Sequence, residues 1–246
     1  MKIYFASDIH LGAPSIKDHR AHEMRFVRFL ESIENDADEL FLLGDIFDYW
    51  FEYKSVAPKG FVRFLGKISQ MTDKGIKVHF FTGNHDVWMW DYLEKECGVE
   101  VHHQHCEIER DGRRLFIGHG DGLGNYDRGY NLLKWIFENR VAQFLYSMLH
   151  PNFANWIATT WSGSSRKRDD KNTKFHTFRN EEEHQVMFTR KQISDGKHFD
   201  YYVFGHRHVE ADYPLNDATR LIVLGQWMSG STYAVMTDGK LELMNA

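Results

Sequence analysis

The chain has 246 residues, a length that a single α/β domain can use in full. Apolar residues make up 42% and charged residues 26% of it, which excludes disordered, collagen-like and coiled-coil proteins. The formal net charge of −5 argues against a protein held on duplex nucleic acid by positive charge, so no nucleic-acid partner is expected.

No apolar stretch of the sequence reaches the roughly 18 residues that a membrane span needs, and no signal peptide precedes the first strand-like run. Cys97 and Cys106 are too few for a disulfide framework, although they could pair with each other. We therefore expect a cytoplasmic protein. The 15 histidines raise the question of a metal site.

A short apolar run that stops at a small, polar or charged cluster recurs along the chain. The runs cover residues 3–6, 40–43, 78–81, 115–117 and 201–204. Runs of this length without alternation are typical of strands that are buried on both faces. Residues 22–32 and 61–71 lie between the early runs and show the apolar spacing of amphipathic helices.

Strands that alternate with helices predict βαβ crossovers around a central sheet. Asp111-Gly112 and Asp238-Gly239 are typical of hairpin turns. We expect a second, more antiparallel sheet that includes residues 107–117, 221–224 and 233–237. The predicted fold class is α/β, a β-sandwich flanked by helices.

Residues 128–161 are helix-like and rich in apolar residues. The basic run Arg166-Lys167-Arg168 follows them. This segment interrupts the strand rhythm, so we interpret about 128–175 as an insertion over the site within a single domain of residues 1–246. It is either an ordinary packed helical pair or a lid over the site.

Functional groups of α/β sheets collect beyond the carboxyl ends of the strands. We therefore expect one sheet edge to carry Asp8, His10, Asp45, Asn84, His119, His206 and His208. This nitrogen and oxygen donor set suits Mn²⁺, Fe or Zn²⁺. Seven ligands are too many for one ion with an open position, but they suit two ions about 3.5–4 Å apart that share a carboxylate. The glycines before four of these residues allow close backbone approach.

Five motifs match, in order, the signature of the calcineurin-like metallophosphoesterases: Asp8-x-His10, Gly44-Asp45-x-x-Asp48, Gly83-Asn84-His85-Asp86, Gly118-His119 and Gly205-His206-x-His208. The chain resembles that superfamily, whose fold is a β-sandwich flanked by helices. The resemblance implies two divalent ions, with Mn²⁺ expected. One would be held by Asp8, His10 and His208, the other by Asn84, His119 and His206, with Asp45 bridging them.

Within the superfamily the chain resembles the UDP-2,3-diacylglucosamine hydrolases of lipid A biosynthesis. Residues 44–50, 119–121, 129–130 and 223–227 and the helical insertion carry this likeness, whereas His85 stands where those enzymes often have Arg. We expect a monomer associated with the inner face of the cytoplasmic membrane. If the inserted helices are a lid, the resemblance implies that they enclose acyl chains and touch the bilayer. The implied reaction would be attack of metal-activated water on the phosphate nearer uridine, which releases UMP and 2,3-diacylglucosamine 1-phosphate.

His85 is the catalytic candidate, because it could hydrogen-bond a phosphoryl or leaving oxygen. Asp48 and Asp86 are expected to orient the imidazoles or the loop. The substrate-binding candidates are Asn84, His85, Asp127, Tyr130, Ser165 and His206.

Two other functions stay open at this point. One is a phosphodiesterase or phosphatase for soluble nucleotides or phosphoproteins, and the other is a non-catalytic scaffold, which the complete ligand set disfavours. Trp50, Trp88 and Trp90 either pack in the core or line a pocket. Most remaining histidines are interpreted as surface or structural residues: His22, His79, His102, His103, His105, His150, His176, His184 and His198.

Overall fold

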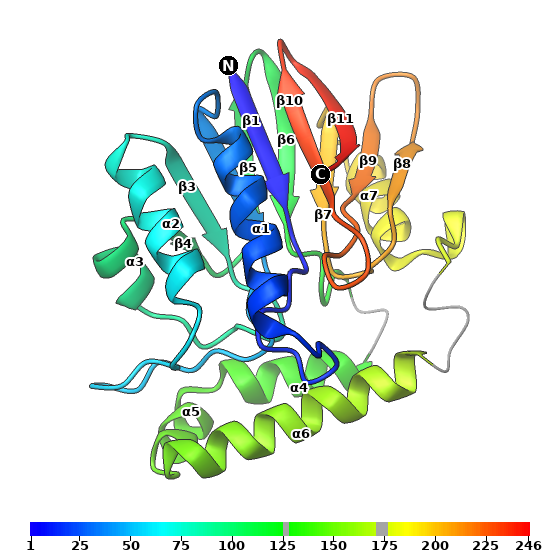
Figure 1. The fold of residues 1–246 in the computed structure, drawn as a ribbon. Coiled ribbons are helices and arrows are strands. Elements are labelled where there is room, and N and C mark those ends of the chain that lie inside the picture. The colour runs from blue at the N-terminus through cyan, green and yellow to red at the C-terminus, as the bar shows by residue number, and fades with distance from the viewer. Residues whose placement is uncertain (125–127, 171–176) are drawn as a thin grey trace.

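Two β-sheets face each other, and helices cover their outer faces (Figure 1). The computed structural model describes residues 1–124, 128–170 and 177–246, without the side chains of residues 128, 131, 161 and 164–170. The first sheet has the order β11-β10-β1-β2-β3-β4. Its strands are β1 (Lys2–Ala6), β2 (Glu39–Leu43), β3 (Lys77–Phe81), β4 (Glu100–His102), β10 (Thr232–Thr237) and β11 (Lys240–Asn245).

The second sheet has the order β5-β6-β7-β9-β8. Its strands are β5 (Cys106–Arg110), β6 (Arg113–Gly118), β7 (Tyr201–Phe204), β8 (Ala211–Pro214) and β9 (Arg220–Val223). The first sheet packs on α1 (His19–Ile33), α2 (Val62–Asp73) and α3 (Tyr92–Cys97). The second packs on α7 (His184–Ser194), which follows the short 3₁₀ helix η1 (Asn180–Glu182).

Successive side chains of a strand point to opposite faces of its sheet and so enter different layers of the core. Ile3 and Phe5 of β1 point between the sheets, where they join side chains such as Ile117 of β6. Tyr4 and Ala6 point the other way, into the cluster under the helices of the first sheet. Both faces of β1 are therefore buried, which explains its continuous apolar run.

The five apolar runs all form strands, β1, β2, β3, β6 and β7, and the two expected early helices are α1 and α2. Both Asp-Gly pairs turn hairpins with positive φ at each residue, 49° and 70° at Asp111 and Gly112 and 50° and 76° at Asp238 and Gly239. Cys97 and Cys106 are free thiols. Trp50 is buried in the core.

One expectation about the sheets is wrong. Residues 233–237 lie in β10, which pairs antiparallel with β1 of the first sheet instead of joining the second. An Asp-Gly pair predicts a hairpin turn, but it does not predict which sheet the strands of that hairpin join. The second sheet is also mixed, because β7 pairs parallel with both β6 and β9.

The insertion after β6 forms α4 (Arg128–Glu138), α5 (Arg140–Ser147) and α6 (Pro151–Asp170). These helices lie as a layer below the carboxyl ends of β1, β3, β6 and β7 (Figure 1). They are therefore positioned at the end of the sandwich where the polar motifs of the sequence follow the strands.

The packing between the sheets predicts a large effect of one truncation. Phe5 is fully buried and stacks on Phe41 with ring centroids 5.1 Å apart. We expect Phe5→Ala to lower the free energy of unfolding by about 4 kcal/mol, because it leaves a cavity in a layer closed on both sides. Urea denaturation measures this, and Val56→Ala, at a 52% exposed position, is the matched control with an effect within about 0.5 kcal/mol. Equal losses in both variants would contradict the assignment of this layer as the core.

Candidate metal centre

The strand ends of both sheets converge at one place. Asp8 and His10 follow β1, Asp45 follows β2 and Asn84 follows β3, all in the first sheet. His119 follows β6, and His206 and His208 follow β7, in the second sheet. The expected residues are thus brought together, but the site lies at the seam between two sheets and not along one sheet edge.

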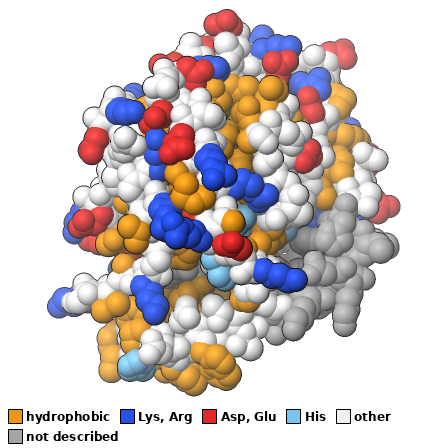
Figure 2. Space-filling view, in the orientation of Figure 1, with side chains coloured by type: hydrophobic (Ala, Val, Ile, Leu, Met, Phe, Trp, Pro, Cys, Tyr) orange, Lys and Arg blue, Asp and Glu red, His pale blue; other side chains and the backbone are white. Residues whose placement is uncertain are grey.

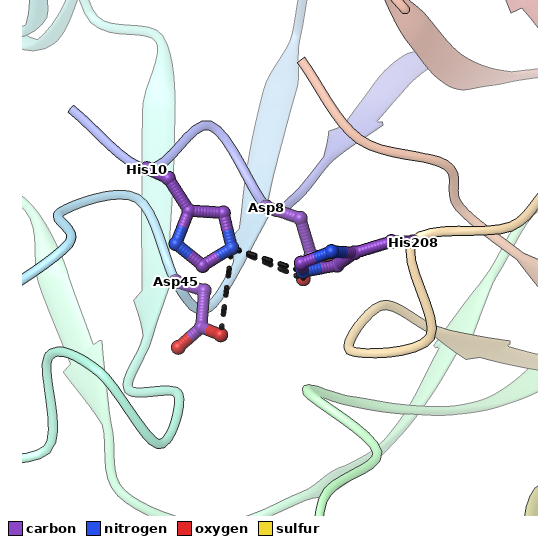
Figure 3. A group of neighbouring side chains, drawn as sticks. All are labelled: Asp8, His10, Asp45 and His208. Carbon is purple, nitrogen blue, oxygen red and sulfur yellow. Dashed lines mark hydrogen bonds and ion pairs between the residues drawn. The ribbon is translucent and has the colours of Figure 1, made fainter. Parts of the chain in front are cut away.

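Asp8, His10, Asp45 and His208 form one group of potential ligands (Figure 3). The Nε2 atoms of His10 and His208 are 3.0 Å apart. Asp8 Oδ1 lies 3.2 Å from His208 Nε2 and 3.8 Å from His10 Nε2. Nitrogen and oxygen lone pairs therefore point at one small volume.

Asp45, His119 and His206 form a second group, which Asn84 completes. Asp45 Oδ2 is 3.3 Å from His119 Nε2. Asn84 Oδ1 is 3.2 Å from His119 Nε2 and 2.9 Å from His206 Nδ1. Because Asp45 Oδ2 also lies 3.8 Å from His10 Nε2, this one carboxylate belongs to both groups.

These residues have unusual backbone conformations. Asp8, His10, Asp45, His206 and His208 have φ values of 55°, 51°, 53°, 71° and 55°. Positive φ is uncommon outside glycine, and such strain is found mainly at functional sites, where the surrounding structure enforces it.

Two glycines allow the strand ends to meet. A Cβ at Gly83 would overlap the Asp45 carboxylate, and a Cβ at Gly205 would lie 2.5 Å from Asp8 Oδ2. Each glycine thus admits a carboxylate from a neighbouring strand end, as the sequence predicts for these positions.

Hydrogen bonds outside the two groups fix the orientation of the imidazoles. His119 Nδ1 donates to the Leu43 carbonyl at 2.8 Å, which leaves Nε2 facing the other ligands. His10 Nδ1 lies 3.3 Å from Asp48 Oδ1. The contact places Asp48 beside the His10 ring, and its orienting role stays a prediction.

Asp86 holds the loop that carries Asp45. Its buried carboxylate accepts hydrogen bonds from the backbone N–H groups of Gly83, Asp45, Ile46 and Phe47 at 2.7, 3.2, 2.8 and 3.2 Å. The side chain therefore ties the turn after β3 to the turn after β2.

The buried carboxylates and imidazoles of the centre shift one another's pKa values. Burial opposes ionisation of Asp45, but the imidazoles of His119, His85 and His10 outweigh it and hold its pKa well below the ordinary value. Burial likewise opposes a charged His119, yet the Asp45 carboxylate raises its pKa to about 10. Burial and His119 lower the pKa of His206 to about 4. A neutral imidazole there is ready to act as a metal ligand.

His85 lies beside the first group. Its backbone N–H donates to Asp45 Oδ1 at 2.9 Å, and its ring contacts the His10 ring edge-on at 4.9 Å. Its Nδ1 donates to the Asp48 carbonyl at 3.0 Å. With Nδ1 as donor, Nε2 can donate as well only when the ring carries both protons.

Glu183 is a supporting residue that the sequence did not single out. It is fully buried, and it accepts a 2.6 Å hydrogen bond from Arg207, which lies between the two histidines after β7. It stands in a run of three glutamates, 181–183, with no local signal to distinguish it. Ser162 of α6 was also missed; it donates to Asp48 Oδ2 at 3.0 Å and links the insertion to the centre.

A cavity of 1090 Å³ opens from the centre toward the inserted helices. Asn84, His85 and His119 line one side, and apolar side chains of α4–α6, such as Leu133 and Ile157, line another. Tyr130 also lines it and donates to Asp121 Oδ2 at 2.8 Å. Trp88 belongs to the lining too. Asp127 and the side chain of Ser165 lie outside the described residues, so their predicted roles stay predictions.

The donor set fits two divalent ions. Asp8 Oδ1 is buried and accepts no hydrogen bond within the described part of the chain, although two imidazole nitrogens face it. An unsatisfied buried carboxylate oxygen is costly unless it coordinates a cation. The buried clusters of Asp and His are thus consistent with a dinuclear metal site.

The profile of the calcineurin-like phosphoesterase family matches residues 1–210. The chain belongs to this family of metal-dependent phosphoesterases. It is 38% identical over 252 residues to the UDP-2,3-diacylglucosamine hydrolase of Porphyromonas gingivalis (strain ATCC BAA-308 / W83), with 98% of this chain and 96% of that protein covered.

A second relative is the UDP-2,3-diacylglucosamine hydrolase of Shewanella sp. (strain W3-18-1), at 27% identity with 97% and 95% covered. Among solved structures, the phosphoesterase Yfce from E. coli matches at 14% identity with a TM-score of 0.45, covering 100% of this chain and 99% of that one.

The Glu183–Arg207 pair predicts a pH-dependent contribution to stability. Burial raises the pKa of Glu183, but the hydrogen bonds and charges of Arg207 and Arg179 outweigh burial and lower it overall. Removing the carboxylate leaves Arg207 without its buried counter-charge, so Glu183→Gln should cost about 3 kcal/mol in unfolding free energy at neutral pH.

The advantage of the native chain over Glu183→Gln should be fully present above about pH 4.3, the ordinary glutamate value. It should shrink as the pH falls toward the lower pKa of the folded state. Urea denaturation of metal-free protein across this range measures it, with exposed Glu182→Gln as the matched control. A difference that stays constant with pH would contradict the ion pair.

Proposed function

We propose that this chain hydrolyses the pyrophosphate bond of a nucleotide-diphospho-lipid, with UDP-2,3-diacylglucosamine as substrate, releasing UMP and 2,3-diacylglucosamine 1-phosphate. The observation that carries the proposal is the cavity itself, which joins the Asp and His clusters to apolar side chains of α4–α6. A ligand that fills it needs a charged part and an apolar part. The 38% identity to a UDP-2,3-diacylglucosamine hydrolase supports the same substrate.

In this proposal Asp8, His10 and His208 would hold one ion, Asn84, His119 and His206 would hold the other, and Asp45 would be shared by both. Mn²⁺ is the proposed metal. When bound, two such ions supply a nucleophile at neutral pH and neutralise charge on the phosphoryl oxygens. The chain then needs no nucleophile of its own, and its other residues bind and orient the substrate.

His85 is the proposed catalytic residue. Its Nδ1 is committed to the Asp48 carbonyl, so a doubly protonated ring directs the Nε2 proton toward a phosphoryl or leaving oxygen. Asn84 lines the cavity, and His206 Nδ1 lies 2.9 Å from its Oδ1. Tyr130, whose hydroxyl is anchored on Asp121, is placed to hold the head group, together with Asp127 and Ser165.

Lys134 adds a cation that the sequence did not single out. It lines the cavity and contacts Asp121 Oδ2 at 2.7 Å, and it is the only lysine or arginine in the described part of the lining. His85 stands where the related enzymes often have Arg and carries charge only when doubly protonated. We therefore assign the permanent positive charge for the diphosphate to Lys134.

The inserted helices are the proposed lid, within a single domain of residues 1–246. Their exposed apolar side chains include Trp135, Met148 and Trp156, which are 63%, 71% and 60% exposed. Figure 2 shows hydrophobic side chains gathered at the lower left of that view, over α5 and the start of α6. Such a surface suits contact with the membrane that supplies the lipid. No helix in the described ranges is both long and apolar enough to span a bilayer.

The first test is turnover of UDP-2,3-diacylglucosamine with Mn²⁺, measured as UMP release. We expect release from the acylated substrate and little from a UDP-sugar without acyl chains. Asp45→Asn should reduce turnover by roughly 100-fold or more, because it removes the shared ligand and with it several kcal/mol of charge stabilisation. If a generic phosphodiester is cleaved equally well, metal-dependent hydrolysis stands but UDP-2,3-diacylglucosamine is refuted as the specific substrate.

The second test concerns Lys134. Lys134→Gln should lower kcat/KM for UDP-2,3-diacylglucosamine by about tenfold, since one charge-assisted hydrogen bond to a phosphate is lost. Steady-state kinetics measure the change. Lys95→Gln, which removes a lysine whose side chain is 70% exposed, is the control and should leave the kinetics unchanged. Native kinetics in Lys134→Gln would exclude contact between this lysine and the phosphates.

A further inference from the structure

A third cluster of potential ligands lies at the open edge of the first sheet. His79 of β3 and Glu100 and His102 of β4, the edge strand, make up the cluster. His79 Nδ1 and His102 Nε2 are 3.1 Å apart. Glu100 completes it, with Oε2 3.2 Å from His79 Nδ1 and Oε1 3.6 Å from His102 Nε2.

Each ring presents its other nitrogen to a further group. His79 Nε2 is buried, makes no hydrogen bond within the described residues, and faces Glu39 Oε2 at 3.6 Å. Glu39 is in turn held by Arg110 of β5, whose Nε lies 3.0 Å from both carboxylate oxygens. His102 Nδ1 faces Cys106 Sγ at 3.5 Å. A carboxylate behind the distal nitrogen of a histidine is the usual support of a metal ligand.

The rings are also fixed by stacking. His79 stacks on Phe41 at 4.3 Å, and His102 stacks on Phe81 at 4.5 Å, with interplanar angles of 11° and 23°. Phe41 and Phe81 belong to the core between the sheets. Burial lowers the pKa of both histidines. The geometry is therefore set before any ion arrives.

We propose that His79, Glu100 and His102 form a Zn²⁺ site that is separate from the centre at the strand ends. Two imidazoles and one carboxylate are a ligand set that zinc uses, and they leave a fourth position for water. Mg²⁺ and Ca²⁺ are disfavoured because they prefer oxygen ligands. The Glu100 side chain is 64% exposed, which gives the ion a route from solvent.

The position of the site suggests a structural role. β4 has only three residues, and the chain crosses from it to β5 of the second sheet within residues 103–105. An ion held by β3 and β4 would fix this edge strand next to the point where the chain changes sheets. Zinc bound there stabilises the folded chain because the unfolded chain has no such preformed site.

The test counts zinc ions, because the strand-end centre also binds metal. Purified protein is equilibrated with buffered Zn²⁺, passed over a desalting column and analysed by mass spectrometry for zinc. We expect about three ions per native chain and about two in Glu100→Gln and in His102→Gln. Glu96→Gln, at an exposed glutamate of α3 nearby, is the charge-matched control and should keep the native count.

A second readout is thermal unfolding with Mn²⁺ present in excess. Added Zn²⁺ should raise the Tm of the native chain more than that of Glu100→Gln, while Mn²⁺-supported turnover is the same in both. Equal zinc counts and equal Tm shifts in the native chain and Glu100→Gln would overturn the site and leave a hydrogen-bonded pair of histidines. If His102→Gln fails to fold, the zinc count and Tm of Glu100→Gln test the site, because the Glu100 side chain is exposed and its replacement should not disturb folding.

Discussion

The Asp45 carboxylate is buried at the seam between the two sheets, and much of the surrounding structure compensates its charge. A buried carboxylate is costly unless cations and hydrogen bonds surround it. The His85 backbone N–H donates to one of its oxygens, and the other lies near the imidazoles of His119 and His10. The ligand groups on both sides share this one residue, so two ions bound there would be held at a short separation by the same carboxylate.

The seam location makes the centre a property of the assembled sandwich. Neither sheet carries a complete ligand group, because β1, β2 and β3 supply one part and β6 and β7 the other. The positive φ values of five ligand residues cost free energy locally, so other contacts must hold them. Asp86 does this for the turn after β2, and the buried Glu183–Arg207 pair does it for the turn after β7. Stability and ligand placement are therefore linked through residues that would not touch the metal.

Strand positions, hairpin turns and the ligand motifs could be predicted from the sequence because each is a local pattern. The assignment of β10 to the first sheet could not be predicted. The turn at Asp238-Gly239 does not indicate that β10 pairs with β1. Supporting partners were missed for the same reason. Ser162 meets Asp48 across 114 positions of sequence, and the Leu43 carbonyl meets His119 across 76. Only the folded chain brings these partners together.

The inserted helices contact the centre through polar groups while exposing apolar ones. Ser162 reaches Asp48, which in turn lies beside His10, and Lys134 reaches Asp121 beside His119. On the other side, Trp135 and Trp156 remain largely exposed although burying them would be favourable. The layer is held by these polar contacts and by packing of Phe137 and Tyr146 on Trp88. It nevertheless keeps apolar surface that no described part of the chain covers. The proposed substrate, with a diphosphate head and acyl chains, would match both properties of the layer.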